Sequence, residues 1–281
     1  MATLNTQLPW YVKGLPAIVA TVIRDPVEAF YRTRTRVVAW KANGAPFHAY
    51  AVEKDWRRRL AAALGTRDTG GFATVWAEAR RSPELAGLRI GPQTYGIWND
   101  GDPALLEAAW CLARRLRPHR VVETGVARGM TSRILLEALE QNGLGRLWSI
   151  DLPPALDRHQ IDEIGIAVPP RLRQRWTYIE GSSRRRLPKL LSELGEIDLF
   201  IHDSMHSEDN VAFEMKLAWT ALRPGGALIV DDIDLNRAFY DFAERSDAKL
   251  AMVCLSEPLE PDVCRLRYEN SGLFGIMLKP G

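Results

Sequence analysis

The chain is poor in cysteine and has no apolar run long enough for a membrane span, and each lack excludes a class of protein. The cysteines Cys111, Cys254 and Cys264 are scattered and form neither a metal-ligand pattern nor a disulfide framework. The apolar stretch 14–23 is too short to cross a bilayer, and no signal-peptide cleavage site follows it. We therefore expect a cytoplasmic protein without a stable membrane span. We expect this stretch to pack on the protein's own core, with a membrane surface as the alternative.

A strong net charge is also missing, because the 281 residues carry a formal net charge of only +2. The charge is uneven, however: residues 1–95 hold 14 lysines and arginines against 7 acidic residues. We interpret this excess as a solvated helical face, and a contact with an acidic partner or a membrane surface is the alternative. We expect no nucleic-acid partner.

The chain is long enough for one large domain with an appendage. We expect residues 1–95 to form an N-terminal helical region, because apolar residues have helical spacing over 56–64 and 72–81. The stretch 87–102 is rich in Gly, Asn and Asp and is predicted to be a loop. Such a region would act as a lid, in oligomerisation or in substrate contacts, and it is compatible with a homo-oligomer. Residues 96–281 would form the main domain.

The main domain alternates between short apolar segments and helical patterns. It begins with a predicted helix over 103–116, for which Asp102 is a suitable N-cap and Pro103 a suitable first-turn residue. Strands are predicted at 120–123, 146–151, 176–180, 197–203, 227–231, 250–255 and 273–279. Helices are predicted between them at 132–142, 157–165, 184–194, 207–222 and 235–245. This alternation predicts an α/β fold, a doubly wound and mostly parallel seven-stranded sheet that binds ligands at the carboxyl ends of its strands.

The first predicted strand runs into a glycine-containing bend and then into a helix. Such a bend brings backbone N–H groups close to a ligand. Glu123 lies two residues before Gly125, and we expect it to face the same crevice. An anion there is unfavourable for a phosphate but favourable for a ligand with an amino group and a sulfonium. The bend therefore points to S-adenosylmethionine (SAM).

The next two strands end in residues that suit the rest of that ligand. Asp151 ends the second strand, where an acid binds a ribose diol in both SAM and dinucleotide sites. The spacing of Gly125 and Gly129 departs from Gly-x-Gly-x-x-Gly and argues against NAD. The third strand is followed by Gly181, Ser182 and Ser183, which are small enough for the edge of an adenine ring. The two serines would equally serve as the N-cap of the next helix.

Three aspartates emerge at one edge of the predicted sheet: Asp203 after the fourth strand, and Asp231 and Asp232 after the fifth. Three converging carboxylates repel one another unless a cation lies between them. Oxygen ligands suit a hard ion, so the cluster predicts a Mg²⁺ site. The alternative is that Asp231 or Asp232 only caps the following turn.

Two histidines flank Asp203. His206 is a candidate general base, with Asp203 beside it, because an imidazole accepts a proton from a hydroxyl near neutral pH. His206 would otherwise cap the helix that begins at Ser207, or stack on the cofactor. His202 lies within the strand and is expected to be a packed core histidine.

From Glu123 to Asp232, the order of these residues resembles that of class I SAM-dependent methyltransferases, which have a Rossmann-like fold. In detail the chain is similar to metal-dependent small-molecule O-methyltransferases, of the catechol type and of the macrolide-sugar type. The resemblance covers about residues 100–281. It implies that Glu123 and Gly125 hold the methionine moiety, and that Thr131 holds its carboxylate. Asp151 would bind the ribose, with Ser182 and Ser183 at the adenine.

The resemblance also implies a reaction, the transfer of the sulfonium methyl group to a hydroxyl oxygen. Catechol-type relatives have a lysine at the position of His206, so this substitution weakens the case for a catechol. We expect a small hydroxylated substrate, such as a sugar of a natural product or polysaccharide. The segment 152–175 would close over the site as a lid. The alternatives are methylation of a protein or nucleic acid, a SAM-binding scaffold without turnover, and an NAD oxidoreductase.

Overall fold

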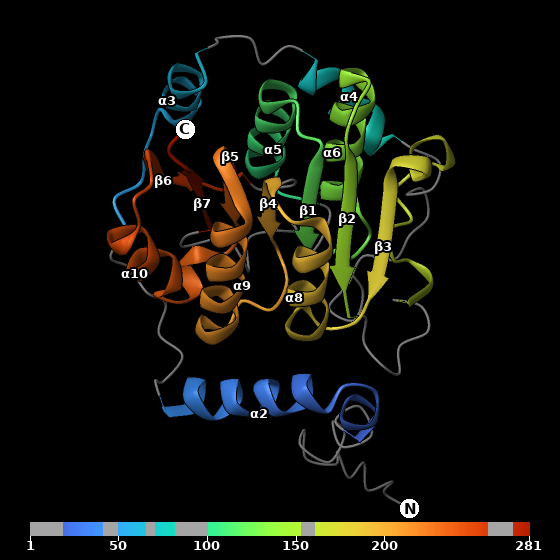
Figure 1. Cartoon of the computed structure of the whole chain (residues 1–281), viewed down its shortest axis with the longest axis vertical. Helices are drawn as coiled ribbons and strands as arrows, with labels where there is room; N and C mark the ends of the chain where they lie inside the picture. Colours follow the sequence, from blue (N-terminus) through green and yellow to red (C-terminus); the bar gives the residue numbers. More distant parts are fainter. Residues whose placement is uncertain (1–18, 42–49, 66–70, 82–100, 153–160, 258–271) are drawn as a thin grey trace, which may run out of the picture.

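The computed structural model describes residues 19–41, 50–65, 71–81, 101–152, 161–257 and 272–281. Within these residues, seven strands form one sheet in the order β3-β2-β1-β4-β5-β7-β6 (Figure 1). The strands are β1 (Arg120–Thr124), β2 (Arg146–Asp151), β3 (Trp176–Glu180), β4 (Ile197–His202), β5 (Leu222–Val230), β6 (Leu250–Leu255) and β7 (Leu273–Leu278). Only β7 runs antiparallel to its neighbours β5 and β6. The predicted fold class, a doubly wound and mostly parallel seven-stranded sheet, is confirmed.

Helices cover both faces of the sheet. The helices along the main domain are α5 (Pro103–Leu116), α6 (Met130–Asn142), α8 (Ser183–Leu194), α9 (Glu208–Ala221) and α10 (Ala238–Arg245), with the 3₁₀ turns η3 (Pro170–Arg175) and η4 (Ile233–Leu235). Successive strand residues point to opposite faces, so Val121 and Val122 of β1 belong to two separate apolar clusters. Trp110 of α5 packs in the first cluster, and Met215 of α9 packs in the second.

The predicted cap of α5 is present. The side chain of Asp102 accepts a hydrogen bond of 2.9 Å from the backbone N–H of Ala104, and Pro103 occupies the first turn. Two short N-terminal helices, α3 (Trp56–Ala63) and α4 (Phe72–Arg80), bury Trp56 and Phe72 in the same cluster as α5. Their bounds differ from the predicted ones by a single residue at the C-terminal end. Most of the predicted loop 87–102 lies outside the described residues.

The order of the strands places the ligand site. The chain moves from β1 through α6 to β2 on one side, and β4 then returns to pair with the opposite side of β1. A reversal of this kind separates the loops that follow the two strands and leaves a crevice beyond their carboxyl ends. The residues that follow β1, β2, β3 and β4 therefore converge at one edge.

The N-terminal helix α2 (Pro26–Lys41) lies across this edge of the sheet (Figure 1). The sequence analysis did not predict it. The guanidinium of Arg184, on α8, lies 3.5 Å from the ring centroid of Tyr31 and holds the helix against the main domain. The expectation that the apolar stretch 14–23 packs on the core is wrong for its described part, residues 19–23. Ile23 is 80% exposed, whereas the buried residues of this region are the acids Asp25 and Glu28 and the small residue Ala29.

Two other details differ from the prediction. β5 begins at Leu222 rather than Ala227, because Leu222 pairs with Ile197 ahead of a register shift. The predicted helix over 157–165 lies partly outside the described residues, and its described part contains mostly turns. Among the described residues, no helix combines the length and the apolar content that a bilayer crossing requires.

Candidate functional site

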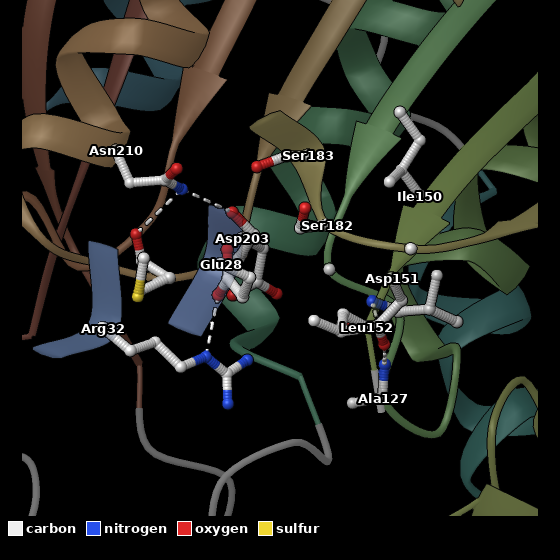
Figure 2. A pocket seen from close by; sticks show the side chains of 15 residues that line it. Glu28, Arg32, Ala127, Ile150, Asp151, Leu152, Ser182, Ser183, Asp203 and Asn210 are labelled. Atoms are coloured by element: carbon white, nitrogen blue, oxygen red, sulfur yellow. Dashed lines mark hydrogen bonds and ion pairs between the residues drawn. The ribbon is translucent and has the colours of Figure 1, made fainter. Parts of the chain in front are cut away.

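A cavity of about 330 Å³ lies between the carboxyl ends of β1 to β4 and the helix α2 (Figure 2). Its walls come from all four strand ends and from α2. The lining residues are Glu28, Arg32, Gly125, Val126, Ala127, Ile150, Asp151, Leu152, Gly181, Ser182, Ser183, Asp203, Ser204, Met205 and Asn210. The volume lies within the range of small-molecule and cofactor sites. The structure thus brings together most of the strand-end residues that the sequence singled out.

The bend after β1 forms one wall of the cavity and is tightly packed. A Cβ atom on Gly125 would lie 1.8 Å from the carbonyl oxygen of Asp203, and Gly125 has a positive φ of 86°. Only glycine fits there. Gly129 also has a positive φ and is the N-cap residue of α6. Thr131, in the first turn of α6, is half-buried and does not line the cavity.

Asp151 closes the bend against β2. Its Oδ2 atom accepts hydrogen bonds of 3.1 and 3.0 Å from the backbone N–H groups of Val126 and Ala127 (Figure 2). Burial raises the pKa of Asp151, although these donors offset part of the effect. In a phosphate site, such N–H groups would point at the ligand. Here a protein carboxylate occupies them, which argues against a dinucleotide pyrophosphate.

Glu123 does not line the cavity, in contrast to the expectation that it faces the crevice. It is fully buried beneath the bend, where its Oε2 atom accepts hydrogen bonds of 2.6 Å from the hydroxyls of Ser132 and Ser149. Burial raises the pKa of Glu123 to about 8, and the nearby carboxylates of Asp203 and Asp151 act in the same direction. Because a buried carboxylate without a cation is costly, this raised pKa favours the neutral form of Glu123 at pH 7.

The residues after β3 line the cavity, but their hydroxyls are engaged by other carboxyl groups. Ser182 donates a 2.6 Å hydrogen bond to Asp25, just before α2, and Ser183 is hydrogen-bonded to Glu214 of α9. Ser182 is also the N-cap residue of α8, although its side chain makes no capping bond. Both serines therefore fix neighbouring elements at the place where the adenine was expected.

Asp203, His206 and Asp231 form a cluster next to the cavity. Their candidate ligand atoms all lie within 4.8 Å of one another. The His206 Nε2 atom lies 3.8 Å from the Asp203 Oδ1 atom and 3.6 Å from the Asp232 Oδ2 atom. This cluster differs from the expected set of Asp203, Asp231 and Asp232. Asp232 has a φ of 49°, which turns the chain immediately after Asp231 and brings its carboxylate towards His206.

The donor set of the cluster fits a divalent cation. Two carboxylates are suitable ligands for Mg²⁺, with substrate or water oxygens completing the coordination. An imidazole nitrogen is a better ligand for Mn²⁺, Fe²⁺ or Zn²⁺. Asp203 belongs to the cluster and also lines the cavity, so an ion bound at the cluster would lie at the cavity wall.

A fully buried hydrogen-bonded pair, His202 and Glu214, lies next to the cluster. The His202 Nδ1 atom lies 2.7 Å from the Glu214 Oε2 atom, and both side chains are fully buried. Glu214 also accepts hydrogen bonds from Thr124, Ser204 and Asn210. Burial alone would raise the pKa of Glu214, but His202 and the hydrogen bonds from Ser183 and Thr124 lower it to about 2. The His202 ring contacts that of His206 edge to face, with centroids 5.5 Å apart.

The prediction that His202 is a packed core histidine is confirmed, whereas the sequence analysis missed its partner Glu214. A signal was present, because Asn210 and Glu214 are polar residues four positions apart on a helix, and therefore on one face. Glu28 and Arg32 were also missed, because α2 was not predicted. Of the expected lid over 152–175, residues 153–160 lie outside the described residues, and Leu152 lines the cavity. The segment 161–175 does not cover the cavity in this structure. None of its residues lines the cavity, and Gly165 and Ala167 bond to the back of the bend instead.

Comparison with known proteins agrees with this geometry. Residues 122–233 match a protein family described as a methyltransferase domain. No curated protein matches the chain. A solved structure from Klebsiella pneumoniae, provisionally described as an O-methyltransferase, is similar over 80% of this chain and 96% of its own, with 17% identity and a TM-score of 0.50.

Two further solved structures show weaker similarity. The O-methyltransferase TomG from Streptomyces achromogenes, involved in tomaymycin synthesis and solved with SAM, has 19% identity and a TM-score of 0.49 over 80% of this chain and 96% of its own. An O-methyltransferase from Bacillus cereus, solved with S-adenosylhomocysteine (SAH), has 14% identity and a TM-score of 0.48 over 79% of this chain and 96% of its own. At 17% identity, the likeness to the Klebsiella pneumoniae structure shows the fold alone.

Proposed function

We propose that this chain, which carries a class I methyltransferase domain, transfers the methyl group of SAM to a hydroxyl oxygen of a small molecule with the help of a divalent cation. The observation that carries the proposal is the position of Asp203. Asp203 lines the cavity and also belongs to the cluster with His206 and Asp231. A hydroxyl bound at the cluster would therefore lie next to a donor bound in the cavity.

The cavity is suited to a cationic donor. The lining carboxylates of Asp151 and Asp203 favour positive charge. The N–H groups of Val126 and Ala127 are bonded to Asp151 and do not form a phosphate site. When bound, SAM supplies an electrophilic methyl group, so the protein needs only to align the acceptor oxygen and remove its proton.

The cluster supplies both of these actions. Asp203 and Asp231 would hold the cation, which positions the acceptor oxygen and promotes loss of its proton. The His206 Nε2 atom would accept that proton, and the carboxylates of Asp203 and Asp232 within 4 Å would offset the charge of the imidazolium. Two adjacent acceptor oxygens would bind such a cation together, which favours a vicinal diol such as a sugar.

The test is the formation of SAH from SAM with a panel of sugars and catechols, in the presence of Mg²⁺ or Mn²⁺. We expect turnover that EDTA abolishes and that either metal restores. Asp203→Asn should reduce turnover by at least about a hundredfold, while Glu193→Gln, at an exposed position of α8, should leave it unchanged. Turnover that survives both EDTA and Asp203→Asn would exclude the cation. SAM binding without turnover on any hydroxylated acceptor would favour a binding protein.

A further inference from the structure

The roof of the cavity comes from α2, which lies outside the segment that matches the methyltransferase family. Glu28 and Arg32, one helical turn apart, reach from α2 to the cavity, and Asp151 and Leu152 lie across from them (Figure 2). The domain alone therefore does not complete this pocket. The roof residues are charged, so they influence which ligand binds there.

Glu28 is held rigidly in place. Its Oε1 atom accepts a 2.7 Å hydrogen bond from the Arg32 Nε atom, and its backbone N–H donates to the Asp25 Oδ1 atom at 3.0 Å. The other oxygen of Asp25 accepts the hydrogen bond from Ser182, which ties α2 to the turn after β3. The Glu28 side chain is only 5% exposed, whereas that of Arg32 is 42% exposed. Glu28 therefore presents a fixed and poorly solvated carboxyl group at the cavity.

The charges that line the cavity are unbalanced. Among the described lining residues, Glu28, Asp151 and Asp203 are acidic and Arg32 is basic. SAM carries a positive sulfonium, whereas the product SAH has lost that charge with the methyl group. A buried carboxylate attracts a nearby cation more strongly than an exposed one does, because water and salt screen it less. The roof can thus distinguish donor from product by charge.

We propose that Glu28 is a specificity-determining residue that makes the cavity bind SAM more tightly than SAH, and that Arg32 holds Glu28 in position while limiting this preference. The inference rests on the proposed function, because it requires that SAM is the ligand of the cavity. A preference of this kind lowers product retention after each methyl transfer. Through Glu28, the N-terminal helix α2 would take part directly in the binding of SAM.

The test compares the affinities for SAM, SAH and sinefungin by isothermal titration calorimetry. In sinefungin a carbon atom that carries an amino group replaces the methylated sulfur. Glu28→Gln removes the carboxylate and leaves Arg32 beside the cavity. We expect it to lower the ratio of SAM affinity to SAH affinity on the order of tenfold, with the same effect for sinefungin. Arg32→Gln removes the opposing charge, so the ratio should stay at the wild-type value or rise. Phe30→Ala, on the exposed side of the same helix, should change neither affinity.

The use of a ratio separates recognition from structural damage. If Glu28 only supports the fold of α2, both ligands weaken equally, the ratio stays constant, and the inference is wrong. A ratio that falls equally in Glu28→Gln and Arg32→Gln also contradicts it, because the two substitutions change the charge in opposite directions. If the wild-type protein binds neither SAM nor SAH, the proposed function fails. Wild-type binding with an unchanged ratio in Glu28→Gln overturns only the role of Glu28.

Discussion

The most informative single substitution is Glu123→Gln, because it replaces a buried acid with its neutral analogue. The structure buries Glu123 completely, and this burial raises its pKa to about 8. Glutamine has the same shape as the protonated acid, and its carbonyl oxygen can accept the same hydrogen bonds from Ser132 and Ser149. The variant should therefore fold as the wild-type protein does.

The pH dependence follows from the two protonation equilibria. Between pH 4.5, the ordinary pKa of glutamic acid, and about 8, the folded state retains a proton that the unfolded chain has released. The free energy of unfolding then decreases as the pH rises, by about 1.4 kcal/mol per pH unit. From pH 5.5 to 7.5, the wild-type protein should lose about 3 kcal/mol through Glu123 alone. Glu123→Gln lacks this loss, so its advantage over the wild type should grow by that amount.

Urea unfolding at several pH values measures this difference. Glu193→Gln, at an exposed position of α8, is the matched control and should follow the wild type at every pH. The difference between Glu123→Gln and wild type should be small near pH 5.5 and large near pH 7.5. A constant difference over this range would refute the reasoning, because it would mean that Glu123 is already ionised in the folded protein.

Two further substitutions test the packing of the site. Gly125→Ala places a Cβ atom 1.8 Å from the carbonyl oxygen of Asp203, so it should destabilise the protein by several kcal/mol and abolish SAM binding. Gly143 has a similar φ of 71° but open space around it, so Gly143→Ala is the control. It should lower the free energy of unfolding, measured by thermal unfolding, by only about 1 kcal/mol. Glu214→Ala leaves His202 buried without its carboxylate and should cost about 3–5 kcal/mol at pH 7. The lowered pKa of Glu214 stabilises the fold above about pH 4.5 and stops doing so as the pH falls towards 2, so Glu214→Gln should approach the wild type in acid. A cost that does not shrink in acid would show that the pair is not charged.

The sequence predicts the sheet well, because buried parallel strands leave a clear pattern of apolar segments between helices. The bounds of β2, β3 and β6 agree with the predicted ones at both ends. The residues that follow β1 to β4 converge as expected, because the order of the strands alone determines which ends meet.

Side-chain directions at the strand ends were harder to predict. The positive φ of Asp232 decides which of its neighbours face Asp203, and no periodicity encodes one such angle. Glu123 has two hydroxyl partners that come from α6 and β2, so its burial depends on tertiary contacts. No local sequence pattern indicates that the Glu123 side chain points away from the crevice.

The roof of the cavity could not be predicted at all. α2 buries Glu28 and the preceding Asp25 while exposing Phe30, which is the reverse of an ordinary amphipathic helix. Its polar side faces the cavity because Ser182 and Arg184 of the main domain supply the partners. Helix prediction from the spacing of apolar residues expects an apolar buried face, so it does not detect such a helix.

A crystal structure of the protein with SAH and Mn²⁺ tests directly whether one site combines the methyl donor and the cation. We predict SAH in the cavity between the bend at Gly125 and the roof at Glu28, with its sulfur facing Asp203. We also predict an anomalous manganese peak between the carboxylates of Asp203 and Asp231. Manganese bound elsewhere, or SAH outside the cavity, would contradict the proposal that one site combines the methyl donor and the cation.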